Sequence, residues 1–480
     1  MVGARPRIFT VFLPESDTRR IHVKLGPVAA VLALAALSVV PARADGPSAP
    51  AGPFPCPDSL REGVDFWKKV WGTWTLSQVV LHDTDHPSIV YDVFELPPPV
   101  GEIYSDAQRD FVKQRREALA ARLDAIELRV AAGQPLTDDE KSLVLAITQA
   151  AGTDALAGSG TRVRSQRGLR ERFRRGLEIS GRYRALFAAI FRSAGLPEDL
   201  ADLPHVESSF QARARSSAGA VGVWQFTRGA ARRFMLVSPG LDERLDPVAA
   251  ARGAAAYLKA AYDELGTWPL AITSYNHGIE GMRAAKERFG TDFERILAEY
   301  DGRAFGFASK NFYKEFLAAR EIAAHPDATF PEGLQPDPPM NHDRVVLDRS
   351  ATPAAIGEKY RVAASTLTEI NPGWTQRALT GRAPIPAGAT VWLPEGTLVA
   401  IAQTATPQRR AEPLPPARKQ GVSAAVAAER FIVHVVRKGE TLFRIAASYG
   451  VSVVNLLDAN DLHVNATIHP GQQLRVPTVR

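Results

Sequence analysis

Apolar residues recur at helical spacing through most of the chain. Over 110–132 and 137–151 they alternate with charged residues in the rhythm of amphipathic helices. The same rhythm fills 169–300, where short Gly, Pro and Asp signals interrupt it and mark the ends of successive helices. The pattern therefore predicts a mainly α-helical protein.

The segment 66–91 mixes aromatic and aliphatic residues. Trp67, Trp71 and Trp74 lie at helical spacing, which suits either a stripe that stacks on sugar rings or a face buried in a core. Core packing is the commoner use of such a stripe, and we expect it here. We assign 57–160 to a helical N-terminal flank.

Two short blocks near the C-terminus share one pattern. Each opens with a β-branched run, continues with an apolar helical stretch, reaches an asparagine turn at Asn371 or Asn460, and closes on a strand. Such repetition predicts two copies of a small βααβ unit. We place them at 343–395 and 431–478, with a proline-bearing linker at 396–430.

The length and charge of the chain bound its class. With 480 residues it should form several domains, and its formal charge of +6 favours an anionic partner. Seven arginines between Arg162 and Arg175 would form either a nucleic-acid patch or a solvated helix face. No nucleic-acid motif accompanies them, so we favour the helix face and expect no nucleic-acid partner.

The first 44 residues have the layout of a secretion signal. Basic residues precede an apolar stretch at 28–40, and Ala42 and Ala44 flank a cleavage point. The apolar stretch is short for a membrane span, which needs roughly twenty residues. We expect an exported, soluble mature protein, although the long basic region leaves a later start codon open. The single cysteine, Cys56, excludes an intramolecular disulfide, and we interpret it as a plain thiol rather than a lipid-attachment site.

Glu207 ends an apolar helical stripe. Leu196, Leu200 and Leu203 fall near the same face, since eleven residues make about three turns. A carboxyl group on such a face is desolvated, which raises its pKa toward the value that a general acid needs near neutral pH. The alternative is a glutamate at a fraying helix end that faces water, and this spacing alone does not separate the two.

Three motifs in fixed order surround this glutamate in the sequence. They are Glu207-Ser208, then Gly222-Val223-Trp224-Gln225, then Tyr275-Asn276. In this combination the sequence resembles the lytic transglycosylase family with a lysozyme-like fold, in particular its membrane-bound D-type branch. The resemblance covers roughly 167–322 and implies a lysozyme-like helical catalytic domain, which we place at 161–330.

The resemblance also implies roles for single residues. Glu207 matches the catalytic acid/base of the family. The positions that match substrate contacts, or that hold the glutamate, are Ser216, Ser217, Gln225, Tyr275 and Asn276. No cofactor and no metal is implied.

Two departures from the family pattern stand out. Ser274 replaces the more usual alanine before Tyr-Asn. Near the end of the domain, where relatives commonly have a substrate-side tyrosine, this chain has Asn311-Phe312-Tyr313. That role is shifted by one residue or lost, so we predict no site residue there.

A single carboxyl group suffices if the substrate supplies its own nucleophile. Glycosidases usually pair two carboxylates across the bond, and the motif region supplies one. The nearest acids, Asp242, Glu243 and Asp246, suit a helix start with Asp246 as N-cap. The resemblance implies that Glu207 protonates the β-1,4 oxygen between N-acetylmuramic acid and N-acetylglucosamine. It then takes the proton of the muramyl C6 hydroxyl, which leaves a 1,6-anhydromuramyl end.

The block at 431–478 resembles a LysM module. Lys438-Gly439-Glu440-Thr441-Leu442 matches the opening of such modules and Pro470-Gly471-Gln472 their end. The resemblance implies binding to glycans that contain N-acetylglucosamine. The block at 343–395 lacks this opening and is a degenerate relative, for which glycan binding and a spacer role both stay open.

These features together predict a periplasmic peptidoglycan lytic transglycosylase. Its partners would be the glycan strands, with no obligate protein partner, and an association with the outer membrane is left open. One alternative is a hydrolytic muramidase, against which the missing second carboxylate argues. Another is a non-catalytic wall-binding scaffold, which would not need Glu207 together with Gln225, Tyr275 and Asn276.

Overall fold

The structure is a computed structural model that describes residues 10–11, 52–405, 431–437 and 468–477, with a few single residues between the last two ranges. The expected signal peptide at 1–44 therefore lies outside the described residues, except for β1 (Thr10–Val11), which pairs in parallel with β5. Most of the linker at 396–430 and the opening motif of the LysM block also lie outside them. Within the described ranges, no helix has both the length and the apolarity that crossing a membrane requires.

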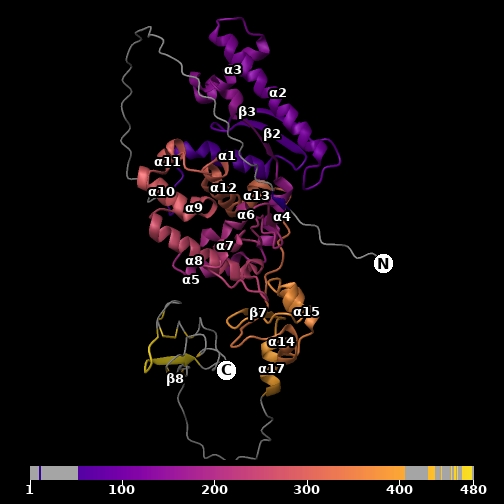
Figure 1. Ribbon diagram of the computed structural model, residues 1–480, viewed down its shortest axis with the longest axis vertical. Helices are drawn as coiled ribbons and strands as arrows, with labels where there is room; N and C mark the ends of the chain where they lie inside the picture. Colours follow the sequence, from indigo (N-terminus) through magenta and orange to yellow (C-terminus); the bar gives the residue numbers. More distant parts are fainter. Residues whose placement is uncertain are drawn as a thin grey trace, which may run out of the picture.

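The described chain is mainly helical, as the sequence predicts, and Figure 1 shows it from the flank at the top to the modules below. The N-terminal flank comprises α1 (Asp58–Gly72), β2 (Gln78–Asp83), β3 (Val90–Glu95), α2 (Asp106–Ala131), α3 (Asp138–Ala151), η1 (Thr153–Leu156), η2 (Ser159–Arg162) and β4 (Val163–Arg167). The central core comprises α4 (Arg170–Ser180), α5 (Arg184–Ser193), η3 (Glu198–Asp202), α6 (Pro204–Glu207), β5 (Arg215–Ser216), α7 (Arg228–Ala231), η4 (Glu243–Leu245), α8 (Pro247–Leu265), α9 (Trp268–His277), α10 (Ile279–Phe289), α11 (Phe293–Glu299), α12 (Phe307–Ala324) and α13 (Pro326–Thr329). The C-terminal part comprises β6 (Asp343–Val346), α14 (Pro353–Tyr360), α15 (Ala364–Ile370), α16 (Gln376–Leu379), β7 (Thr390–Leu393), α17 (Thr397–Ala405), β8 (Phe431–Val435) and β9 (Gln473–Pro477).

The N-terminal flank is not wholly helical, and in this respect the sequence-based prediction is wrong. Strands β2, β3 and β4 form an antiparallel sheet in the order β3-β2-β4. The central strand, β2, is buried along nearly its whole length, so its apolar residues form a continuous run without the alternation of a half-exposed strand. A short continuous apolar run cannot be told from a buried helical segment by periodicity alone.

The two amphipathic helices predicted in the flank are present as α2 and α3. Each starts with a capping box, in which the side chains of the N-cap and of the third helical residue satisfy each other's backbone N–H groups. The pairs are Ser105 with Gln108, and Thr137 with Glu140. The first cap starts α2 at Asp106, before the predicted 110, whereas the second starts α3 at Asp138, beside the predicted 137.

The arginine run does not form one helix face, which corrects the sequence-based interpretation. Its first members lie in η2 and β4, where pairing with β2 takes over from the helical pattern, and only the later ones lie on α4. Arg162 binds the fully buried Asp83, with Nε 2.9 Å from Oδ2. On α4, Arg170 and Arg175 form ion pairs with Glu332 and Asp337. The run is therefore divided between η2, β4 and α4.

The tryptophan stripe is part of the core, as predicted. Trp67, Trp71 and Trp74 are 5%, 5% and 9% exposed. Trp71 stacks on Phe173 of α4 at 5.0 Å between ring centroids, and Nε1 of Trp67 donates to Oδ1 of Asn311 on α12 at 3.1 Å. Helix α1 is thereby fixed against the two helices that lie next to the candidate site.

The block at 343–395 has the predicted βααβ order. Strands β6 and β7 pair antiparallel, with α14 and α15 between them. The side chain of Asn371 donates to Leu367 O at 2.8 Å and to Trp392 O at 2.9 Å, and it accepts from Trp392 N at 2.8 Å. The asparagine therefore ties the second helix to the closing strand.

The second block repeats this hydrogen-bond pattern. Asn460 donates to Leu456 O and to Arg475 O, each at 2.7 Å, and accepts from Arg475 N at 2.6 Å. Strands β8 and β9 also pair antiparallel. The shared device supports the interpretation of the two blocks as copies of one unit.

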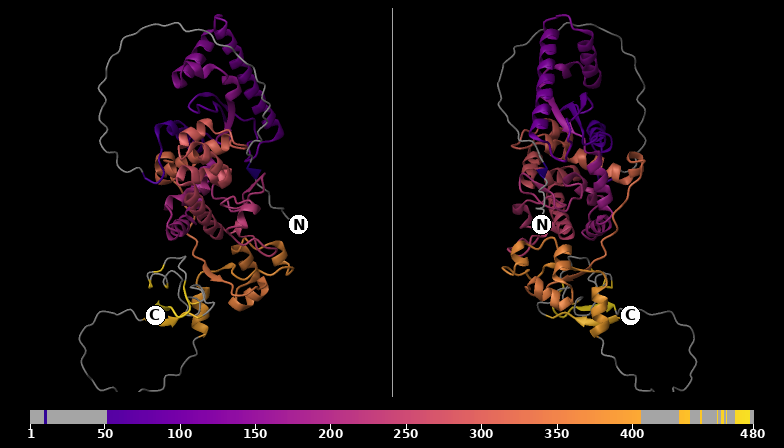
Figure 2. Two further views of the ribbon diagram at one scale, coloured as in Figure 1. Left: turned by 60° about the vertical axis from the view of Figure 1, so that its left-hand side comes forward. Right: turned by 90° about the vertical axis from the view of Figure 1, so that its right-hand side faces the viewer.

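The first block is docked on the central core, below it in both views of Figure 2. Nε1 of Trp392 donates to Oδ2 of Asp246 at 2.6 Å. The backbone of Asp242 donates to Gly373 O at 2.8 Å, and that of Thr375 donates to Gly240 O at 3.1 Å. We name this block the docked module. Helix α17 follows it directly and occupies the start of the predicted linker.

Candidate active site

Glu207 lies at the end of two short helical segments rather than one. The 3₁₀ helix η3 leads into α6, which has Pro204 at its first position. Proline lacks the N–H that a continuous α-helix would use there, so a new helix starts at this point. Leu196, Leu200 and Leu203 are nevertheless buried as the stripe predicts, and Glu207 keeps a partly exposed side chain.

The chain turns sharply after Glu207. Ser209 and Phe210 both have positive φ, at 50° and 58°. Side chains rarely adopt this conformation unless the surroundings impose it. Oγ of Ser208 donates to Val223 O at 2.7 Å, so the serine of the Glu-Ser pair joins the catalytic turn to the Gly-x-x-Gln loop.

The Gly-x-x-Gln loop is held by its own first and last residues. Gly222 has φ +81°, and a Cβ atom there would lie 2.0 Å from the carbonyl oxygen of Arg244. Nε2 of Gln225 donates to Gly222 O at 2.7 Å. Between them Trp224 is fully buried, with Nε1 donating to Pro247 O at 3.2 Å. Position 222 therefore requires glycine, because its φ is positive and there is no room for a Cβ atom. Gln225 closes the loop through its hydrogen bond to Gly222 O.

Tyr275 and Asn276 come from the last turn of α9. Oη of Tyr275 donates to Trp224 O at 2.9 Å, which connects α9 to the Gly-x-x-Gln loop. Burial and the nearby charge of Glu207 raise the pKa of Tyr275 well above its usual value, so it is a neutral phenol. Oδ1 of Asn276 accepts from Oγ of Ser309 at 2.8 Å. The first of these two residues adjoins Glu207, and the second is bound to α12.

The two predicted serines differ in their surroundings. Oγ of Ser216 accepts from Ala220 N at 3.0 Å and so shapes the turn that leads to the Gly-x-x-Gln loop. Ser217 is exposed on that turn. Of the two, Ser217 is the one whose hydroxyl faces solvent rather than the turn.

The protonation of Glu207 is the main electrostatic feature of the site. Burial and the negative charge of Glu315 raise the pKa of Glu207 to about 8. A carboxyl group with this pKa carries its proton at neutral pH and can donate it. This raised pKa favours the interpretation of Glu207 as a desolvated carboxyl group over that of a glutamate that faces water.

Glu315 is a second carboxyl group that the motifs do not reveal. It lies on α12, which packs against α6, and burial raises its pKa to about 8 against a small opposing effect of Arg164. Arg164 reaches this region from β4, with its guanidinium 3.8 Å from the centre of the Phe307 ring. Glu315 has no motif around it, and the sequence analysis did not single it out.

The other nearby acids serve the helix start, as predicted. Asp246 accepts from Val248 N and Ala249 N, both at 2.9 Å, and so caps α8. Asp242 forms an ion pair with Arg244 at 2.7 Å, and Glu243 accepts from Leu236 N at the same distance. All three carboxylates are occupied.

Tyr313 lies near the end of the domain, where the sequence analysis predicts no site residue, and its hydroxyl is turned toward the flank. Tyr313 is fully buried, and its hydroxyl donates to Pro55 O at 2.8 Å, so it anchors the start of the flank. The neighbouring residue, Phe312, faces Tyr275: the two rings are nearly parallel, with 6.4 Å between their centroids. A phenyl ring therefore adjoins Tyr275.

As for metals, within the described residues no three His, Cys, Asp or Glu side chains form a group that could hold an ion.

The pairing of Glu207 with Glu315 predicts a pH effect. Cleavage should decline as the pH rises through about 8, because Glu207 then loses the proton that it donates. Glu315 ionises over the same pH range as Glu207, and its negative charge then helps to raise the pKa of Glu207. Glu315→Gln removes that charge, so the alkaline limb of the kcat/KM profile should move to lower pH.

Glu321→Gln, also on α12 but paired with Arg61 and Lys68, is the matched control and should leave the limb in place. A loss of rate in Glu315→Gln at every pH, with an unmoved limb, would assign Glu315 a structural role only.

Comparison with known proteins agrees with this geometry. The family model for the transglycosylase SLT domain matches residues 185–296, and the LysM domain model matches residues 434–477. Membrane-bound lytic murein transglycosylase D from two strains of Escherichia coli is 26% identical over 311 residues. That alignment covers 61% of this chain and 63% of each relative, so the chain spans less than two thirds of their length.

A solved structure of an inactive mutant of the lytic transglycosylase Slt from Pseudomonas aeruginosa also aligns, at 18% identity. It covers 44% of this chain and 30% of that one, with a TM-score of 0.27. The sequence matches lead to one conclusion: the chain carries a transglycosylase SLT domain and a C-terminal LysM domain, and is similar to membrane-bound lytic murein transglycosylase D.

Proposed function

We propose that this protein is a peptidoglycan lytic transglycosylase with Glu207 as its single acid/base. The observation that carries the proposal is the hydrogen bonding that joins the three motifs around Glu207, a carboxyl group whose pKa is raised by burial to about 8. Ser208 and Tyr275 both bind the backbone of the Gly-x-x-Gln loop, so the carboxyl group, the loop and α9 form one unit. A protonated carboxyl group in a fixed frame is what acid catalysis of glycoside cleavage needs.

In the proposed reaction Glu207 donates its proton to the oxygen between C1 of N-acetylmuramic acid and C4 of N-acetylglucosamine. The C1–O bond breaks, the glucosamine leaves with a new hydroxyl group, and the muramyl acetamide supports the positive charge at C1. The Glu207 carboxylate then takes the proton of the C6 hydroxyl as its oxygen bonds to C1. This restores the acid and forms the 1,6-anhydro ring without consuming water.

The surroundings of Glu207 favour this route over a hydrolytic muramidase. A covalent intermediate would need an ionised carboxylate as nucleophile. Glu315 has a pKa of about 8 and carries its proton at neutral pH, which makes it a poor nucleophile. Asp242, Glu243 and Asp246 are occupied by backbone or arginine donors.

Substrate and location follow from the same proposal. The substrate-binding residues would be Ser216, Ser217, Gln225, Tyr275 and Asn276, with Ser217 as the exposed hydroxyl. The LysM domain at 434–477 would hold the protein on the glycan strands. Because this polymer lies outside the cytoplasm, the protein would be exported by the predicted signal peptide and act in the periplasm, where an association with the outer membrane would keep it beside its substrate.

The test is mass spectrometry of purified peptidoglycan after digestion by the protein. The expected products are muropeptides with anhydro ends, which are lighter by one water than those with reducing ends. Reducing ends in their place would identify a muramidase. Binding to sacculi without release of any muropeptide would favour a scaffold.

A further inference from the structure

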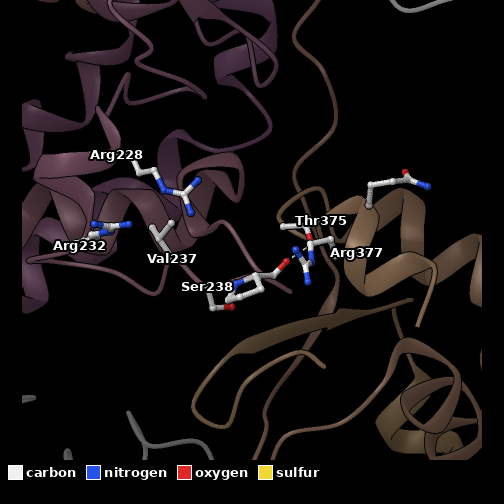
Figure 3. Close-up of a pocket in the computed structure, with 8 residues that line it drawn as sticks. Arg228, Arg232, Val237, Ser238, Thr375 and Arg377 are labelled. Atoms are coloured by element: carbon white, nitrogen blue, oxygen red, sulfur yellow. Dashed lines mark hydrogen bonds between the residues drawn. The ribbon is translucent and has the colours of Figure 1, made fainter. Parts of the chain in front are cut away.

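The junction between the central core and the docked module contains a pocket of about 560 Å³ (Figure 3). The core lines it with the segment around α7, and the module lines it with the start of α16. The lining residues are Arg228, Arg232, Val237, Ser238, Pro239, Thr375, Gln376 and Arg377. Figure 3 shows Arg228 and Arg232 on the core side and Arg377 on the module side. Three guanidinium groups thus surround one concave surface.

These three arginines lack acidic partners among the described residues. In the part of the chain that the structure describes, no carboxylate lies within ion-pair distance of Arg228, Arg232 or Arg377, and all three are exposed. By contrast, Arg170, Arg174 and Arg175 on α4 have acidic partners. Uncompensated positive charge in a concave site concentrates anions, and a guanidinium group binds a carboxylate with two parallel hydrogen bonds.

The two sides of the pocket are held at a fixed separation. Oγ1 of Thr375 donates to Pro239 O at 2.6 Å, and Thr375 N donates to Gly240 O at 3.1 Å. At Gly240 an added Cβ would lie 2.0 Å from Pro384 O, so the two backbones are in direct contact. The arginines therefore project from a rigid junction, and a ligand need not order the two elements when it binds.

The core side of the pocket continues from the candidate active site. Arg228 opens α7 and follows Gln225 by three residues. Gln225 closes the Gly-x-x-Gln loop next to Tyr275, so α7 extends the surface on which we place the glycan strand. A substituent that branches from a glycan strand bound beside the Gly-x-x-Gln loop would therefore lie next to α7.

We propose that this pocket binds the free carboxylates of the peptide stems of the strand being cleaved. The inference rests on the proposed function, since the stem is the part of peptidoglycan that carries negative charge. The volume suits a short peptide segment, and arginines on both walls suit carboxylates spaced along it. The docked module then contributes Arg377 to substrate recognition rather than acting only as a spacer.

The experiment compares two substrates and two double variants of the full-length protein. The substrates are intact sacculi and the same glycan after an amidase has removed its peptides. The variants are Arg228→Gln/Arg377→Gln and the control Arg349→Gln/Arg361→Gln, which removes two exposed arginines elsewhere on the docked module. Thermal unfolding of each variant monitors the fold.

We expect the pocket variant to lose roughly ten-fold in kcat/KM on intact sacculi, the loss of one or two charge-assisted hydrogen bonds. On peptide-free glycan it should match the wild type, and the control should match it on both. Equal losses on both substrates, or none, would overturn the proposal. If the wild type forms anhydro ends on neither substrate, the proposed function fails instead.

A binding measurement gives a readout that does not depend on turnover. Calorimetry with the full-length Glu207→Gln variant should detect binding of a free stem tripeptide. The same peptide with amidated carboxylates should bind more weakly. Stronger binding of inorganic phosphate or of anionic lipid vesicles than of the peptide would assign the pocket to a phosphate-bearing ligand and overturn the proposal.

Discussion

Replacing Glu207 with glutamine should lower the rate of anhydro-end formation by about three orders of magnitude, the middle of the range for a general acid. Glutamine has nearly the same shape and cannot donate a proton at the glycosidic oxygen. The loss should appear in kcat, because the groups proposed to bind the sugars are unchanged. The measurement is the initial rate of anhydro-muropeptide release from purified sacculi.

The matched control is Glu287→Gln, an exposed glutamate on α10. It makes the same chemical change in the same domain and should keep the wild-type rate. A Glu207→Gln protein with a tenth or more of the wild-type rate would show that another group donates the proton, and Glu315 would be the first to test.

The same variant also separates lost chemistry from lost fold. Folding raises the pKa of Glu207 from an ordinary 4.5 to about 8, so the folded state favours the protonated form. The resulting stability is complete below pH 4.5 and is lost as the pH rises through 8. Glutamine stays neutral, so above pH 8 the variant should have a higher free energy of unfolding than the wild type. The expected difference is about 1–3 kcal/mol, since contact with solvent reduces the full effect of the pKa shift. Denaturant unfolding measures it.

Gly222→Ala should destabilise the protein by roughly 3 kcal/mol or more, the cost of a strained backbone angle together with a steric clash. The new methyl group would lie 2.0 Å from the carbonyl oxygen of Arg244, a backbone atom of a buried residue that cannot move aside alone. The loop would have to open, and the contact of Gln225 with Gly222 O would be lost. Activity should fall with stability, and urea unfolding measures the latter.

Gly219→Ala is the control for this substitution. Gly219 has almost the same φ, +78°, but no atom lies within 4 Å of an added Cβ. Gly219→Ala should therefore lower the free energy of unfolding only by the cost of placing alanine at a positive φ, about 1 kcal/mol. Equal destabilisation of the two variants would mean that the backbone angle, and not the contact with Arg244, explains the glycine in this motif.

The sequence predicts best where a local pattern decides the outcome. The helices α2 and α3, the buried tryptophan face of α1 and the cap at Asp246 all follow from spacing within a few residues. Strand β2 was missed because its burial on both faces removes the alternation that identifies strands. The arginine run was misplaced for the same reason, since β4 exists only through its pairing with β2.

The site divides in the same way. Glu207, Gln225, Tyr275 and Asn276 could be singled out because they lie in motifs. Glu315 could not, because it acts on Glu207 through the packing of α12 on α6 and has no local signature. The arginine pocket also arises only when a module distant in sequence docks beside α7.

The carboxylate of Asp246 has a consequence for cooperativity. One oxygen accepts the backbone N–H groups that start α8, and the other accepts Nε1 of Trp392 from the docked module. Undocking the module would leave that buried oxygen without its donor at the first turn of a central core helix. Module and core are therefore energetically coupled and should melt together, so the smallest autonomous folding unit runs past the end of the matched SLT segment and includes β7.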